Sequence, residues 1–144
     1  MSGRRARAAA VSVAVPVRRR LPDTRESVTR KLTIHASVDD RIEVVECYAT
    51  LGFYADGRPG ELFLKIGRQG SAVSGLADSW AIAVSLCLQY GVPVADIVRK
   101  FRHLRFEPSG ATGDKEQRVA ASIVDYVVGW IDRVVAKRQR GGAR

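Results

Sequence analysis

Hydrophobic and polar residues alternate along three stretches in the first half of the chain. Lys31–Ala36, Glu43–Tyr54 and Glu61–Ile66 place apolar side chains at every second position, as in a strand with one buried face. Asp39–Arg41 and Asp56–Gly60 lie between these stretches and carry the residue types that favour turns. The pattern predicts a small antiparallel sheet of about three strands.

The spacing of apolar residues becomes helical after residue 70. Leu76–Leu88 is apolar on nearly every side, which predicts a central helix that its neighbours bury from several directions. Gly91 and Pro93 end this helix. Apolar residues at helical spacing over 94–104 then predict a second, amphipathic helix.

The last third of the chain predicts a third helix. Arg105–Gly113 has the composition of a loop, and Asp114 with Gln117 three residues later has the spacing of a capping box. The apolar positions that follow at helical spacing are Val119, Ile123, Tyr126, Val127, Trp130, Ile131 and Val134. Strands followed by helices predict an α+β fold with three helices packed on one face of the small antiparallel sheet.

Charge is concentrated at the two ends of the chain. The net charge of the 144 residues is +9, with +7 on residues 1–31, +4 on residues 137–144 and −2 on the rest. We therefore expect a basic, flexible N-terminal arm over 1–20, one folded domain over 21–136 and a basic C-terminal tail over 137–144. A domain of this size needs no metal or disulfide framework to fold.

The basic ends are candidate contacts for nucleic acid. Their Lys and Arg side chains can pair with phosphates without sequence preference. The candidates are Arg4, Arg5, Arg18, Arg19, Arg20, Lys137, Arg138 and Arg140. No aromatic residue lies among them to stack on bases. The simpler alternative is that both ends are solvated segments.

A glycine-rich turn before the first helix is a candidate phosphate site. Gly67, Arg68, Gly70 and Ser71 join a strand to a helix start, where free N–H groups and the helix dipole attract anions. The segment does not contain the full P-loop motif. The simpler alternative is a turn followed by a helix cap.

No other set of residues predicts a self-sufficient active site. Cys47 and Cys87 both lie at apolar positions, which predicts inert core thiols. His35 and His103 have no partners at the spacing of a metal site, and neither is placed to activate a serine. The longest apolar run, Ala81–Leu88, is too short to span a membrane. We expect no metal site, no membrane association and a cytoplasmic location.

Several motifs together resemble one known family. They are Arg20–Thr29 (RLPDTRESVT), Tyr54–Glu61 (YADGRPGE), Gly70–Ser79 (GSAVSGLADS), Leu88–Pro93 (LQYGVP) and Arg105–Gly110 (RFEPSG). In this order, over residues 19–130, they resemble the C-terminal TSCPD-type domain of adenosylcobalamin-dependent (class II) ribonucleotide reductases. The resemblance implies a relation to oxidoreductases that convert ribonucleoside diphosphates to deoxyribonucleotides for DNA synthesis, with adenosylcobalamin as the cofactor of the parent family.

The chain also departs from that family. Arg30 stands where the resemblance leads us to expect histidine, and Trp80 and Ala111 stand where it leads us to expect phenylalanine. The radical reaction of the parent enzymes needs at least three thiols and an enclosed cavity, whereas this chain has two cysteines.

The resemblance therefore implies an accessory domain rather than a complete enzyme. We expect a free-standing domain that binds no cofactor by itself, partners a reductase catalytic chain and has a nucleotide as a further candidate ligand. One alternative is a small protein that binds nucleic acid through its arginine-rich ends. Another is a homo-oligomer that associates through the third helix.

Overall fold

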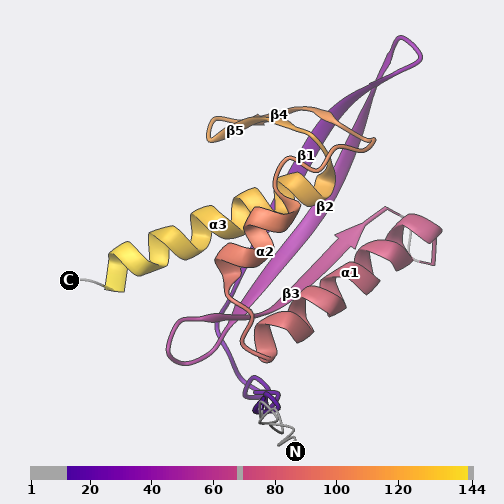
Figure 1. Cartoon of the computed structure of the whole chain (residues 1–144). Coiled ribbons are helices and arrows are strands. Elements are labelled where there is room, and N and C mark those ends of the chain that lie inside the picture. The colour runs from indigo at the N-terminus through magenta and orange to yellow at the C-terminus, as the bar shows by residue number, and fades with distance from the viewer. Residues whose placement is uncertain (1–12, 68–69, 143–144) are drawn as a thin grey trace, which may run out of the picture.

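A computed structural model describes residues 13–67 and 70–142. Five strands and three helices follow one another along the chain (Figure 1). Their bounds are β1 (Ser27–Val38), β2 (Arg41–Phe53), β3 (Pro59–Ile66), α1 (Ala72–Gln89), α2 (Val94–Phe101), β4 (Gly110–Asp114), β5 (Gln117–Ala120) and α3 (Ile123–Gly142). The predicted α+β class is confirmed, although the sheet has five strands where about three were expected.

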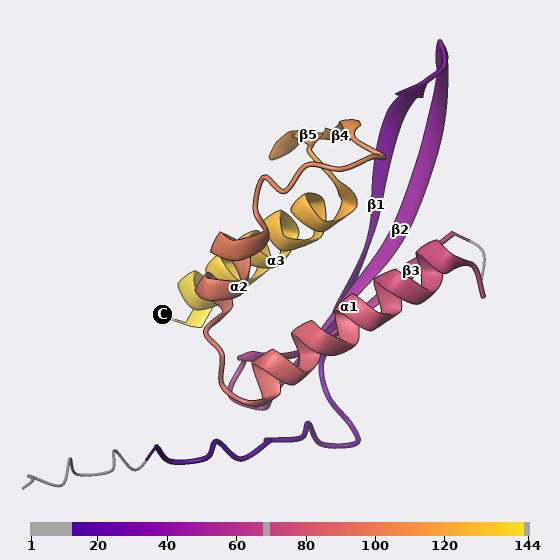
Figure 2. The ribbon, with the colours of Figure 1, turned by 45° about the vertical axis from the view of Figure 1, so that its right-hand side comes forward.

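The strands form one antiparallel sheet in the order β3-β2-β1-β4-β5. The long hairpin of β1 and β2 turns at Asp39 and Asp40, which both have positive φ, as the common two-residue hairpin turn requires. The tip of this hairpin projects beyond the other strands (Figures 1 and 2). The three strands predicted from alternation are therefore confirmed, each with an earlier start.

One face of the sheet carries the core. Alternate residues of β1, β2 and β3 point to this face and are buried: Leu32, Ile34, Ala36, Cys47, Ala49, Leu51, Phe53, Leu62, Leu64 and Ile66. The three helices lie on the same side (Figure 2). Intervening residues such as His35 and Tyr48 are exposed on the opposite face, so the helices cover the sheet on one side only.

Helix α1 packs along β3, the edge strand of the sheet. The Leu62 N–H donates to Ser85 Oγ (2.9 Å), which also lies 3.1 Å from the Leu62 carbonyl oxygen. Gln89 Nε2 donates to the Gly60 carbonyl (3.0 Å). Edge strands otherwise present unpaired backbone groups to solvent and to other chains. Two polar side chains of α1 therefore face inward and satisfy the backbone of β3.

The prediction that α1 is buried from several directions is wrong. The large apolar side chains of Leu76 and Ile82 are 72% and 61% exposed. Among the described residues, no other helix or strand lies over the outer side of α1 in either view (Figures 1 and 2). Helix α1 therefore carries more apolar surface than the rest of the fold covers.

The prediction for residues 105–122 is also wrong. Instead of a loop followed by a helix start at Asp114, β4 and β5 form a short hairpin in which Asp114 pairs with Gln117. Val119, which was expected on the third helix, is exposed on β5. The start of α3 lies later in the chain, where the Asp125 N–H donates to Ser122 Oγ (3.0 Å). The spacing of Asp114 and Gln117, which resembles that of a capping box, thus belongs to a turn between two strands.

Candidate functional site

A groove of about 1650 Å³ opens between the first half of α1 and the start of α3. Its floor includes Val45 and Cys47 of β2. Its walls are Val73, Leu76, Ala77 and Trp80 from α1 and Phe106, Pro108, Ile123 and Val127 from the other side. The lining is mainly apolar, and its charged residues are Glu43, Glu46, Glu107 and Lys65. A second hollow, on the β3 side of α1, has about 490 Å³ and is smaller.

The indole of Trp80 lies in the α1 wall of the groove. Its ring packs edge-on against Phe101, with the ring centroids 5.5 Å apart. Its Nε1–H is buried and has no hydrogen-bond acceptor among the described residues. The resemblance to class II reductases leads us to expect phenylalanine at this position, and these apolar surroundings suit a ring without a donor.

The two cysteines lie in different environments. Cys47 is fully buried, and this burial raises the pKa of its thiol to about 12, with a smaller opposing contribution from the Lys65 backbone. The thiol of Cys47 therefore stays protonated at neutral pH and is a poor nucleophile. Cys87 is exposed, which corrects its prediction as a core thiol: it lies on the outer side of α1.

The outer side of α1 forms an apolar surface beside the groove. We define the α1 outer face as Val73, Leu76, Ile82, Leu86 and Tyr90, the exposed large apolar residues of this helix and its C-cap. Asp78 is the one charged residue in the helix. In the described part of the chain, α1 alone is long and apolar enough to cross a membrane by length and composition, with 28% of it buried in the fold.

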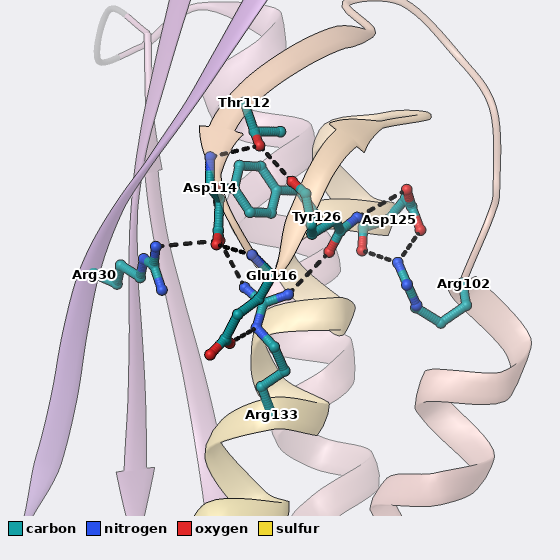
Figure 3. Close-up of polar contacts among 9 residues, drawn as sticks. Arg30, Arg102, Thr112, Asp114, Glu116, Asp125, Tyr126 and Arg133 are labelled. Atoms are coloured by element: carbon teal, nitrogen blue, oxygen red, sulfur yellow. Dashed lines mark hydrogen bonds and ion pairs between the residues drawn. The ribbon is translucent and has the colours of Figure 1, made fainter.

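A buried polar cluster joins the β4–β5 hairpin to α3 (Figure 3). Asp114 Oδ2 accepts hydrogen bonds from Tyr126 Oη (3.1 Å) and Arg133 Nη2 (2.8 Å) and lies 3.1 Å from Arg30 Nη2. Its Oδ1 accepts from the Glu116 N–H (2.9 Å). Burial raises the pKa of Asp114, but the Glu116 N–H and the two guanidiniums outweigh it and hold that pKa below its usual value.

Asp125, in the first turn of α3, is likewise a buried carboxylate that accepts several hydrogen bonds. Its Oδ1 accepts from Arg102 Nη1 (2.5 Å) and the His103 N–H (2.8 Å), and its Oδ2 accepts from the Ala121 N–H (2.9 Å) and Gln117 Nε2 (3.2 Å). Burial raises the pKa of Asp125, but the two backbone N–H groups and Arg102 outweigh it and lower that pKa. Both carboxylates are fully hydrogen-bonded, which indicates a structural rather than a catalytic role.

Sequence reasoning missed this polar cluster. Ser122 and Asp125 have the spacing of a helix cap, which would have located the start of α3. Arg30, Arg102 and Arg133 come from β1, the end of α2 and the middle of α3. No local pattern indicates that these three side chains meet the same pair of carboxylates.

The predicted phosphate site extends outside the described residues, because Arg68 lies there. Gly67 and Gly70 have positive φ, as turn glycines do. Ser71 is the N-cap of α1 and accepts a hydrogen bond from the Ser74 N–H (3.2 Å). This cap uses one of the N–H groups that an anion would need. Phosphate binding at this turn stays a prediction.

Two of the predicted basic N-terminal contacts are engaged within the fold. Arg18 Nε donates to Gln89 Oε1 (2.7 Å). The guanidinium of Arg19 lies over the ring of Tyr54, 4.6 Å from its centroid. Arg20 is exposed, and Arg4 and Arg5 lie outside the described residues. The proposed boundary between arm and domain at residue 20 stays a prediction.

The predicted basic tail begins as the last turns of α3, which extends to Gly142. Arg138 donates to Glu26 Oε2 (2.7 Å), and its guanidinium lies 3.7 Å from the ring centroid of Phe53. Lys137 and Arg140 are exposed. Nucleic-acid binding by these residues stays a prediction.

Histidine and carboxylate side chains do not gather into a metal site in the described part of the chain. Over residues 13–67 and 70–142, no group of three His, Cys, Asp or Glu side chains is placed to hold an ion. His35 is exposed on the open face of β1, and His103 follows α2 with positive φ.

Comparison with known proteins identifies the family. Residues 14–135 match the TSCPD domain, which is most of the chain and includes the sheet, α1, α2 and the larger part of α3. The chain belongs to the TSCPD domain family. The resemblance seen in the motifs is thereby confirmed. No solved structure matches this TSCPD domain.

Curated relatives of this TSCPD domain are much longer proteins named vitamin B12-dependent ribonucleotide reductase. The relative from Rhodopirellula baltica is 47% identical over 116 residues, which are 81% of this chain and 10% of the relative. The relative from Streptantibioticus cattleyicolor is 46% identical over 78% of this chain and 17% of its own length. The relative from Bradyrhizobium diazoefficiens is 39% identical over 76% of this chain and 8% of its own length. The TSCPD domain thus spans 8–17% of the length of these relatives.

The groove does not fit the cobalamin that the relatives' name implies. None of its described lining residues is a histidine, so the groove offers no imidazole ligand to a metal ion. Its one thiol, Cys47, stays protonated because burial raises its pKa to about 12. The apolar walls also offer few partners for the amide groups at the rim of a corrin.

Proposed function

We propose that this TSCPD domain is an accessory part of a vitamin B12-dependent ribonucleotide reductase system. In this role it associates with a reductase catalytic chain and does not reduce ribonucleotides alone. The observation that carries the proposal is the 46–47% identity of most of this chain to a small segment of much longer reductases. A cytoplasmic location and a part in DNA precursor synthesis belong to the same proposal.

The chemistry of the chain supports an accessory rather than a catalytic role. Reduction by a thiyl radical requires a radical cysteine and a redox pair, and the full sequence has two cysteines. Burial holds the thiol of Cys47 in its protonated form. Asp114 and Asp125 are occupied by their own hydrogen bonds, so neither carboxylate is free to act as a base.

Two other functions have less support. Arg19 and Arg138 form ion pairs with Asp56 and Glu26 of their own domain, which reduces the charge available to nucleic acid. Trp130 and Ile131 of α3 are buried in the core of the same chain. These side chains are therefore not available to a second copy, as an oligomer through α3 would require.

Reconstitution with a reductase tests the proposal. The probe is the Rhodopirellula baltica relative with the segment matched by this chain deleted, and the full-length relative is the folding control. Complex formation is measured by isothermal titration calorimetry. Deoxynucleotide formation is measured with a ribonucleoside diphosphate, adenosylcobalamin and a dithiol.

We expect this chain to bind the shortened reductase and to raise its turnover, and to form no deoxynucleotide when assayed alone. The lack of any complex would contradict the proposed association. Turnover by the purified chain without another polypeptide would contradict the accessory role.

A further inference from the structure

We propose that the α1 outer face, together with the adjoining mouth of the groove, is the surface through which this TSCPD domain docks onto the reductase catalytic chain. This inference rests on the proposed function and goes beyond it by naming the contact surface. It begins from the orientation of α1, whose polar Ser85 and Gln89 face inward to β3 while Leu76, Ile82 and Leu86 face outward.

The chemistry of this surface matches a stable protein interface. The α1 outer face holds four large apolar side chains along a helix of 18 residues, about 27 Å long at the usual rise per residue, and a fifth at its C-cap. The core of an interface is depleted of charge and enriched in apolar and aromatic residues. Asp78 is the one charged residue of α1, so a partner can cover the helix without burying many charges.

The groove extends this surface. Val73 and Leu76 belong both to the α1 outer face and to the groove wall, so the two apolar areas are continuous. The groove adds half-buried Trp80 and exposed Phe106. Buried aromatic anchors in a pocket dominate the energetics of most interfaces. Three glutamates and one lysine, Lys65, also line the groove. This excess of carboxylates favours basic side chains on the segment that enters it.

A protein partner suits the α1 outer face better than a lipid surface does. Helices that lie on membranes carry Lys and Arg on their polar side, where they meet anionic headgroups. Helix α1 contains no Lys or Arg. Its inward polar groups are also committed to the backbone of β3, so α1 cannot leave the fold without exposing an edge strand.

The reductase itself is the occupant that the comparisons favour. In the relatives, the segment that corresponds to this chain is about a tenth of one continuous polypeptide. Continuity of the polypeptide gives such a segment a high effective concentration near the rest of the protein, and an apolar face is the part of it that gains most from contact there.

The test compares binding of matched variants to the shortened Rhodopirellula baltica reductase. Leu76→Glu with Ile82→Glu places two charges on the α1 outer face, at side chains that are mostly exposed and so do not support the core. Val119→Glu places one such charge on β5, at a residue of similar exposure (62%) far from α1 in the sheet order. Circular dichroism and urea unfolding establish that all variants fold.

We expect the α1 double variant to bind at least 30-fold more weakly than the wild type, and Val119→Glu to bind within threefold of it. Equal binding by the double variant and the wild type would overturn the inference while leaving the proposed association intact. If the wild-type chain does not bind, both proposals fail. Self-association or binding to anionic vesicles that is lost in the double variant, without an effect on reductase binding, would assign the face to another occupant and overturn the inference.

Discussion

The two ends of this domain differ in how fully contacts within the chain satisfy or cover their side chains. At the β4–β5 end, the buried carboxylates of Asp114 and Asp125 are paired with polar and partly exposed basic side chains from several segments (Figure 3). At the α1 end, polar groups are few and already bound to β3, while large apolar side chains remain in solvent. The polar groups of the β4–β5 end are satisfied within the chain, whereas the α1 end has apolar surface that the chain does not cover.

This difference separates residues that maintain the fold from residues that are free to meet a partner. Buried, paired charges contribute to a unique arrangement and become costly when one partner is removed. Exposed apolar side chains contribute little to folding, because they remain in solvent in the folded state. Substitutions at the polar end should therefore change stability, and substitutions on the α1 outer face should change binding.

The largest expected effect is at Asp125. The Asp125→Ala substitution removes a carboxylate that is 2% exposed and leaves Arg102, Gln117 and two backbone N–H groups without their acceptor. We expect a loss of about 3 kcal/mol in the free energy of unfolding, measured by urea denaturation.

Asp132→Ala is the matched control, because Asp132 is an exposed carboxylate on the same helix. We expect this change to stay within about 0.5 kcal/mol of the wild type. Similar losses in both variants would show that the hydrogen bonds of Asp125 are not the source of the effect.

The next largest effects are expected at two glycines, one in α3 and one in α1, where alanine should change stability in opposite directions. A Cβ at Gly129 of α3 would overlap Gln117 Oε1 and lie 3.0 Å from Arg102 Nη1. Both side chains are held by hydrogen bonds to Asp125, so Gly129→Ala should destabilise by about 2 kcal/mol. A Cβ at Gly75 of α1 meets no atom within 4 Å, so Gly75→Ala should stabilise by roughly 0.5–1 kcal/mol through helix propensity. Thermal unfolding of both variants measures the contrast, which would be refuted by shifts of the same sign.

The parts of the fold that sequence predicted are those with a local pattern. Alternation identified β1, β2 and β3 because one face of the sheet is buried and the other is open. The β4–β5 hairpin was missed because its strands have five and four residues, too short for alternation to be seen. What stabilises it is the contact of Asp114 with Arg30 and Arg133, which are distant in sequence.

The error at α1 has a different physical origin. Hydropathy reports how much apolar surface a helix carries, and it does not report whether the same chain supplies enough neighbours to cover it. The candidate groove could not be predicted from the sequence for a similar reason. The groove depends on Cys47, Trp80 and Phe106 meeting from three separate segments, and no spacing in the sequence predicts that meeting.

Acid should destabilise the polar cluster at the β4–β5 end before it destabilises α1. The pKa values of Asp114 and Asp125 lie below their usual value in the fold, so their ionised forms stabilise it. That contribution is complete above the unfolded pKa of about 4 and is lost as the pH falls through the lower folded values. Hydrogen exchange from pH 6 to pH 3 should show earlier loss of protection in β4, β5 and α3 than in α1.

The double variant Asp114→Asn with Asp125→Asn should have a shallower dependence of stability on pH below 4, because it lacks both titrating groups. A slope identical to that of the wild type would contradict the assignment of this acid sensitivity to the polar cluster.

The smallest expected effect is at the α1 outer face. Leu76 and Ile82 are 72% and 61% exposed, so Leu76→Gln and Ile82→Gln remove little buried apolar surface and should each change the free energy of unfolding by less than about 0.5 kcal/mol. Leu88→Ala, on the buried side of the same helix, should instead cost about 3 kcal/mol. Urea denaturation of the three variants compares the two sides of one helix. A loss at Leu76 or Ile82 that approached the loss at Leu88 would mean that the fold itself depends on the α1 outer face, and the contrast between a self-sufficient end and an open end would no longer hold.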